Sequence, residues 1–209
     1  SGADLMVWGE PFARAGLITT LMDQFRCFTA DWPPRTYFID SFSGELSFEI
    51  ATPADRGLAL WEAIHAAGAP YGITPYGTEA MHVMRAEKGF IMIGDETDGT
   101  VIPQDLGMSW AISKKKPDYI GKRAQERSFM ASPDRWKLVG LESLSGKVIP
   151  DGAYAVADGT NGNGQRKTQG RVTSSYHSPT LDKPIAMGLV RHGPARMGQV
   201  LDFPMPDGA

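Results

Sequence analysis

The chain has 209 residues, of which 42% are hydrophobic, and a formal charge of −3. These values are typical of a globular protein with one large or two small domains. The net negative charge argues against nucleic acid as a partner, because such proteins need a basic surface. No stretch approaches the ~20 apolar residues that span a bilayer, so we expect neither a membrane segment nor a signal peptide.

Cysteine and histidine usage narrows the chemistry further. Cys27 is the only cysteine, so no disulfide can form within the chain, and a cytoplasmic location is expected. The four His residues lie far apart in sequence and form no HExxH-like pattern. We therefore expect no metal site.

The first half of the chain alternates helical and extended patterns. Apolar spacing predicts a helix over residues 10–26, and residues 35–51 read as a β-hairpin. Thr52 and Pro53 are typical of a helix start, and Gly68 is expected as the left-handed residue that ends that helix. Helical spacing favours a shared face for the apolar residues that follow the start, namely Leu58, Trp61 and Ile64.

A second helix is predicted to open at Thr74-Pro75 and to end at Gly89. The apolar run Phe90 to Ile93 favours a short buried strand or extended segment, and residues 94–99 favour an acidic turn. A short helix is expected over residues 118–127. The three lysines before it are expected to form a solvated loop.

The pattern changes near residue 133. Beyond it, short β-like runs are broken by Gly and Pro, which favours a small sandwich or barrel. Residues 158–169 are polar and glycine-rich, and we expect a hairpin loop there because the segment lacks GxxxxGK[ST]. The five predicted strands are Trp136 to Leu141, Gly152 to Ala157, Gly170 to Ser175, Ile185 to Val190 and Gln199 to Phe203.

The stretch Phe42 to Ile50 carries the most information about function. Leu46, Phe48 and Ile50 alternate, so they share one face of a strand, and Glu49 must point to the opposite side. A carboxylate held on a rigid strand can bind a ring that bears N–H donors. The pattern also fits an ordinary solvent-facing Glu on a two-faced sheet, and spacing alone leaves both readings open.

Several motifs in order along the chain resemble the glycine-cleavage T-protein (aminomethyltransferase) superfamily. They are Phe42-Ser-Gly-Glu-Leu-Ser-Phe-Glu49, Gly72 to Gly89, Asp98 to Trp110, Tyr119-Ile-Gly-Lys-Arg123, and Gly170-Arg-Val-Thr-Ser-Ser-Tyr-His-Ser-Pro-Thr-Leu181. Within this superfamily the sequence is most similar to the C-terminal region of the sarcosine oxidase α subunit. Two features suggest this: Gly77-Thr-Glu-Ala-Met-His82 and Ser113-Lys-Lys-Lys-Pro-Asp118.

The resemblance implies an α+β fold: the C-terminal part of a folate-binding aminomethyltransferase-like body, over residues 1–132, and a small β-barrel over residues 133–209. By this resemblance we expect the family's N-terminal half to lie outside this chain. By the same resemblance Glu49 binds the pterin ring of tetrahydrofolate. Phe42 occupies a position that is usually Tyr, so it can contact the ring but cannot donate a phenolic hydrogen bond.

The catalytic residue remains unassigned from the sequence. The family's catalytic Asp lies upstream of the hairpin and has no clear match here. An Arg tied to the active site of the T-protein is replaced by Met81.

The resemblance leaves three functions open. In the first, the chain is the folate-binding module of a sarcosine-oxidase-like α subunit. It passes the one-carbon unit from oxidised sarcosine to tetrahydrofolate, with flavin and NAD bound elsewhere in the parent enzyme and other subunits as partners. In the second, it is a free-standing aminomethyltransferase or folate-dependent demethylase. In the third, it is a non-catalytic structural remnant.

Overall fold

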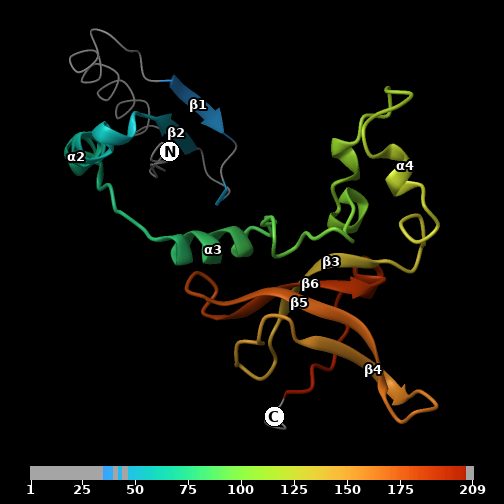
Figure 1. Cartoon of the computed structure of the whole chain (residues 1–209). Coiled ribbons are helices and arrows are strands. Elements are labelled where there is room, and N and C mark those ends of the chain that lie inside the picture. The colour runs from blue at the N-terminus through green and yellow to red at the C-terminus, as the bar shows by residue number, and fades with distance from the viewer. Residues whose placement is uncertain (1–34, 40–41, 44–46, 206–209) are drawn as a thin grey trace. The chain divides into compact units, whose positions relative to one another are not determined.

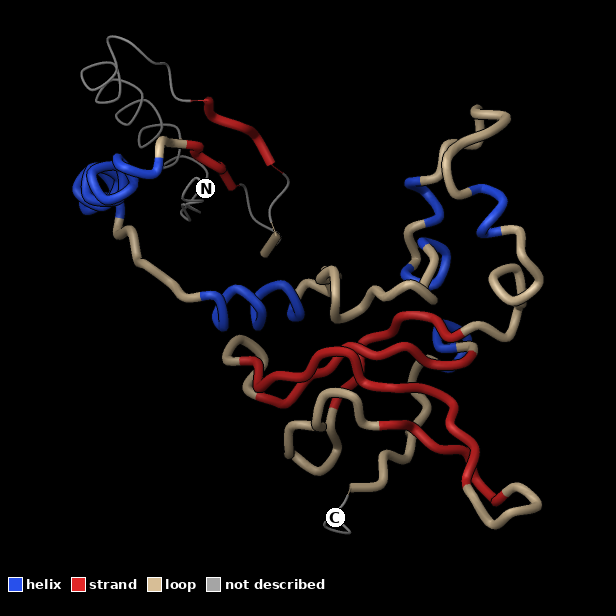
Figure 2. Tube along the Cα trace, in the orientation of Figure 1, coloured by secondary structure: helices blue, strands red, loops and turns tan. Residues whose placement is uncertain are grey.

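The computed structural model describes residues 35–39, 42–43 and 47–205. They belong to two compact units that divide between His82 and Val83. Figures 1 and 2 show the elements of each unit along the chain. The helix predicted over residues 10–26 lies outside the described residues.

The first unit begins with the predicted hairpin. Strand β1 (Arg35–Ile39) pairs antiparallel with β2 (Ser47–Ala51), with Phe38 opposite Phe48 and Tyr37 opposite Glu49. The two strands lie side by side in Figure 1. This pairing confirms the hairpin and fixes its register.

The predicted helix after the hairpin also forms. A 3-10 turn, η1 (Ala54–Arg56), leads into α2 (Gly57–Gly68). Ile50 of β2 packs with α2 residues Leu60, Ile64 and Ala67, which follow one another at helical spacing along the buried face. The expected apolar face was wrong for two of its three residues, because Leu58 is 71% and Trp61 44% exposed.

Gly68 does not take the left-handed conformation expected of it. Its φ of −82° keeps it in the right-handed region, and the turn η2 (Ala69–Tyr71) follows before Gly72 takes up a φ of +71°. Glycine at position 68 has a packing reason instead. A Cβ there would lie 2.6 Å from the Cβ of Ile73. The loop that follows α2 can therefore approach closely only because this position has no side chain.

Helix α3 (Thr78–Glu87) starts later than predicted. The Thr74 hydroxyl donates to the carbonyl of Gly72, 3.3 Å away, instead of capping a helix. Gly89 ends the helical segment as predicted: its φ is +72°, and its N–H bonds to the carbonyl of Ala86.

The strand proposed for Phe90 to Ile93 does not form, and Ile93 is 88% exposed. The N–H groups of Asp95 and Glu96 instead bond to the carbonyl of Met92 and close a tight turn.

The second unit contains an antiparallel sheet with the order β3-β6-β5-β4. Four of the five predicted strands are confirmed, while Gln199 to Phe203 contributes only an isolated bridge between Asp202 and Val156. The sheet strands are β3 (Trp136–Glu142), β4 (Tyr154–Thr160), β5 (Arg166–Ser178) and β6 (Lys183–Arg191). Ile149, Val172 and Ala186 form the buried apolar cluster of the unit.

Short helices and loops complete the second unit. Residues 161–165 join β4 to β5, so the expected hairpin loop forms between longer strands than predicted. The helix expected over 118–127 shortens to α4 (Lys122–Gln125). The remaining turns are η3 (Pro103–Leu106), η4 (Ser109–Ala111) and η5 (Gly193–Arg196). Within the described part of the chain, no helix has the length and apolar character needed to cross a bilayer.

Candidate functional site

The predicted folate-binding residues lie on and beside the β1–β2 hairpin. Glu49 occupies a paired position in β2, directly before the buried Ile50. Phe42 is half-buried in the turn region and Ser43 is buried next to it. The side chain of Glu49 lies outside the described part of the structure, as does Gly44. The roles of Glu49 and Phe42 therefore remain predictions.

A second polar centre, which the sequence did not predict, surrounds Arg85 near the end of α3. Arg85 and Glu96 are both fully buried, and the guanidinium Nη1 lies 2.7 Å from Glu96 Oε2. Arg85 Nη2 donates to Ser174 Oγ at 2.6 Å and to Asp95 Oδ2 at 3.2 Å. The Tyr176 ring lies 5.8 Å from the guanidinium carbon. Arg85 therefore joins the turn at 95–96 to strand β5.

A β-bulge in β5 supplies two further groups to this centre. The register of β5 against β6 shifts between Val172 and Ser174, so Thr173 is the extra residue. Both hydroxyls, of Thr173 and of Ser174, donate to Glu96 Oε1. The Met92 N–H donates to Glu96 Oε2 at 2.8 Å. The buried carboxylate thus has partners on both oxygens, as a buried charge requires.

Glu87, like Arg85, connects α3 to the sheet. It accepts a hydrogen bond from the Ser178 hydroxyl and one from the Thr180 hydroxyl, the latter at 3.0 Å. Ser178 is fully buried at the end of β5. Together with Arg85, this carboxylate fixes the last turn of α3 against β5.

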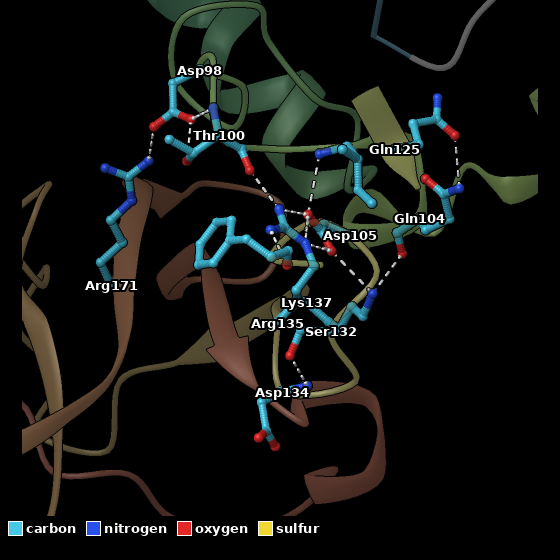
Figure 3. Close-up of polar contacts among 12 residues, drawn as sticks. Asp98, Thr100, Gln104, Asp105, Gln125, Ser132, Asp134, Arg135, Lys137 and Arg171 are labelled. Atoms are coloured by element: carbon cyan, nitrogen blue, oxygen red, sulfur yellow. Dashed lines mark hydrogen bonds and ion pairs between the residues drawn. The ribbon is translucent and has the colours of Figure 1, made fainter. Parts of the chain in front are cut away.

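A fourth set of contacts centres on Asp105 in η3 (Figure 3). Asp105 is 2% exposed. It accepts hydrogen bonds from the guanidinium of Arg135, with Nε at 2.9 Å from Oδ2, and from Lys137 Nζ at 3.0 Å. Burial alone would raise the pKa of Asp105. The hydrogen bonds from Arg135, from the Ile102 N–H and from Lys137 outweigh burial and leave the pKa below its ordinary value.

Asp98 forms a more exposed pair with Arg171, which Figure 3 also shows. Its Oδ2 lies 3.0 Å from Arg171 Nη2, and its Oδ1 accepts both the hydroxyl and the N–H of Thr100. These two bonds from Thr100 lower the pKa of Asp98, with a smaller contribution from Arg171. The same carboxylate opens the turn that follows it, in which the Val101 N–H bonds to the carbonyl of Asp98.

The chemistry of these centres is structural. Each buried carboxylate is already paired with a cation or with hydroxyl and N–H donors, which leaves it poorly suited to take a proton from a substrate. Across the described ranges, no three His, Cys, Asp or Glu side chains are grouped so that they could hold a metal ion. These contacts join the segment before the sheet to the strands of the second unit.

Comparisons with known proteins identify the family. The family model of the GCVT N-terminal domain matches residues 33–116, and that of the glycine cleavage T-protein C-terminal barrel domain matches residues 137–209. The chain belongs to this family. The α+β fold with a C-terminal barrel domain, expected from the resemblance, is therefore confirmed.

Individual relatives agree with this assignment. The chain is 48% identical over 167 residues to the sarcosine oxidase subunit alpha of Corynebacterium sp. (strain P-1), covering 79% of this chain and 17% of that subunit. It is 35% identical over 158 residues to the aminomethyltransferase of Halothermothrix orenii, covering 76% of this chain and 42% of the enzyme.

A solved structure supports the fold as well. The crystal structure of glycine cleavage system aminomethyltransferase T from Bartonella henselae superposes with a TM-score of 0.66 at 29% identity. It covers 81% of this chain, and the chain covers 45% of that structure. The chain therefore spans less than half of this aminomethyltransferase, and a smaller share of the sarcosine oxidase subunit.

Proposed function

We propose that this chain is the folate-binding module of a sarcosine-oxidase-like α subunit. The observation that carries the proposal is the 48% identity to a sarcosine oxidase subunit alpha across most of the chain. Membership of the aminomethyltransferase family supports the coarser function, a folate-dependent one-carbon transfer module. In this proposal sarcosine is oxidised on a flavin elsewhere in the enzyme, and other subunits are partners.

The described backbone fits a role for Glu49 in binding tetrahydrofolate. Position 49 is held in a paired strand, and burial of the adjacent Ile50 against α2 anchors that strand. Strand alternation puts successive residues on opposite faces, so a residue next to a buried one belongs to the other face. A carboxylate there would accept two N–H bonds from an aminopyrimidine edge, and its charge would strengthen both.

The cofactor and the protein have separate tasks in this proposal. Tetrahydrofolate, when bound, accepts the one-carbon unit. The protein binds and orients it, which is the usual protein contribution to cofactor chemistry. Phe42 would pack against the ring without donating a hydrogen bond. The sequence still assigns no catalytic acid or base, so the proposal rests on binding and orientation.

Calorimetric titration of the 209-residue chain with tetrahydrofolate tests the proposal. We expect Glu49→Ala to weaken binding by about 10- to 100-fold, since a hydrogen bond to a charged group contributes roughly 1.5–3 kcal/mol. The matched control is Glu62→Ala, which removes an exposed carboxylate on α2 and changes no hairpin residue. It should leave the affinity for tetrahydrofolate unchanged. An affinity that Glu49→Ala leaves unaltered would reject the role of Glu49.

Two further outcomes separate the alternatives. If the unaltered chain binds no tetrahydrofolate even at high concentration, the third function, a structural remnant, is favoured over the proposal. If the chain alone transfers an aminomethyl group to tetrahydrofolate, it is a free-standing aminomethyltransferase, as the match to such enzymes would allow.

A further inference from the structure

A groove of about 510 Å³ runs beside strand β4 of the second unit. Strand β4 is the last strand in the sheet order, and its outer side meets the segment that contains Asp202 through the bridge to Val156. Val156 and Val200 contribute to the lining. The volume lies within the range of small-molecule sites, roughly 300–1,000 Å³. None of its lining residues belongs to the hairpin that carries Glu49.

Arg196 lines this groove, and two amide side chains hold its guanidinium. Nη1 donates to Gln169 Oε1 at 2.8 Å, and Nε donates to Gln199 Oε1 at 3.0 Å. Gln169 is itself fixed, because its Nε2 donates to the carbonyl of Val156 at 2.6 Å. Nη2 makes no hydrogen bond with any described residue, and no carboxylate forms an ion pair with Arg196 within that part of the chain.

This arrangement differs from the other buried or half-buried arginines of the unit. Arg85, Arg135 and Arg171 each pair with a carboxylate. Arg196 is oriented by neutral amides, and no described carboxylate forms an ion pair with it. A guanidinium held in a fixed plane with two free N–H donors on Nη2 is suited to an oxyanion.

The other residues that line the groove favour one kind of oxyanion ligand over another. Asp158 and Asp202 also border the groove, and Asp202 is already paired with Arg166. Two carboxylates near the site oppose a ligand with two negative charges, such as a phosphate monoester. Val156 and Val200 offer apolar contact to the rest of a ligand. We propose that the groove beside β4 binds a monocarboxylate with an apolar body, with its carboxylate on Arg196.

Protein-observed NMR with 4-phenylbutyrate as the probe tests this proposal. We expect the probe to shift the backbone amides of β4 and of residues 199–202. Arg196→Gln should weaken binding by about tenfold or more, the effect of losing a charged hydrogen-bond donor. Arg196→Lys keeps the charge but loses the planar fork, so it should give an intermediate affinity. Lys147→Gln removes an exposed cation outside the groove lining and should have no effect.

Several results would overturn the proposal. One is an affinity for 4-phenylbutyrate that both Arg196 variants leave unchanged while their amide spectra show an intact fold. Equal binding of 4-phenylbutylamine would show that the carboxylate is not recognised. Tighter binding of phenyl phosphate would overturn the choice of a monocarboxylate. The Glu49 variants serve as a cross-check, because they should not alter binding in this groove, so failure here and failure of the folate proposal remain distinguishable.

Discussion

Replacing Arg85 with Met should destabilise the second unit by about 3–5 kcal/mol, the range for removing one partner of a buried ion pair. Both side chains of the Arg85–Glu96 pair are 0% exposed, so water cannot solvate the Glu96 carboxylate that remains charged in the variant. The change also removes the donor to Ser174. Glu96 would keep its bonds from Met92, Thr173 and Ser174, which limits the loss but leaves an unpaired buried charge.

Native-state hydrogen exchange of amides in β5 and β6 is the appropriate measurement, because it reports the second unit separately from the first. Arg171→Met is the matched control. It breaks the pair with Asp98, whose side chains are 32% and 41% exposed, and should cost about 0–1 kcal/mol. The double variant Arg85→Met with Glu96→Met should cost less than Arg85→Met alone, because no fully buried charge is left unpaired. Equal losses for Arg85→Met and Arg171→Met would refute the reasoning.

Three further predictions concern the other polar and close-packed positions. The pKa of Asp105 is lower in the folded state than in the unfolded state. Its ionised form therefore stabilises the fold above the unfolded pKa, and this stabilisation is lost as the pH falls through the folded pKa. Asp105→Asn should therefore flatten the acid side of a curve of unfolding free energy against pH. Loss of solvation raises the pKa of Asp151, and repulsion from Asp95 adds a smaller rise, so ionisation of Asp151 opposes folding as the pH rises. Asp151→Asn should therefore increase the free energy of unfolding at neutral pH, measured by urea unfolding. Gly68→Ala should lower the stability of the first unit by about 1–3 kcal/mol in hydrogen exchange, because its Cβ would overlap Ile73, and no change would show that the loop can move away.

Local patterns predicted the elements well where periodicity and turn chemistry act together. The hairpin, a helix after Thr52, the end of α3 at Gly89 and four strands of the sheet follow from alternation, helical spacing and glycine. The cap expected from Thr52 was wrong, because neither η1 nor α2 has a side-chain cap. The buried strand expected at Phe90 to Ile93 was wrong, because hydrophobicity alone does not show that a turn follows. Backbone bonds to Met92 close that turn and expose Ile93.

The polar centres could not be predicted in the same way, because their partners lie far apart in sequence. Glu96 reads as part of an acidic turn, yet it is fully buried by contacts with Arg85 and with Thr173 and Ser174. No local pattern marks the β-bulge that turns both hydroxyls toward it. The one available signal is an Arg and a Glu on either side of the apolar run Phe90 to Ile93, and that signal is weak without the fold.

The long-range polar contacts also bear on how the chain unfolds. Each joins a residue before position 132 to one after it: Arg85 to Ser174, Glu87 to Ser178, Asp98 to Arg171 and Asp105 to Arg135. Three of the four involve at least one side chain that is nearly or fully buried. Opening residues 83–132 away from the sheet would therefore break the Asp105–Arg135 and Asp98–Arg171 ion pairs and the serine hydrogen bonds to Arg85 and Glu87 in one step. The segment and the sheet should lose hydrogen-exchange protection together, whichever residue marks the domain boundary in sequence.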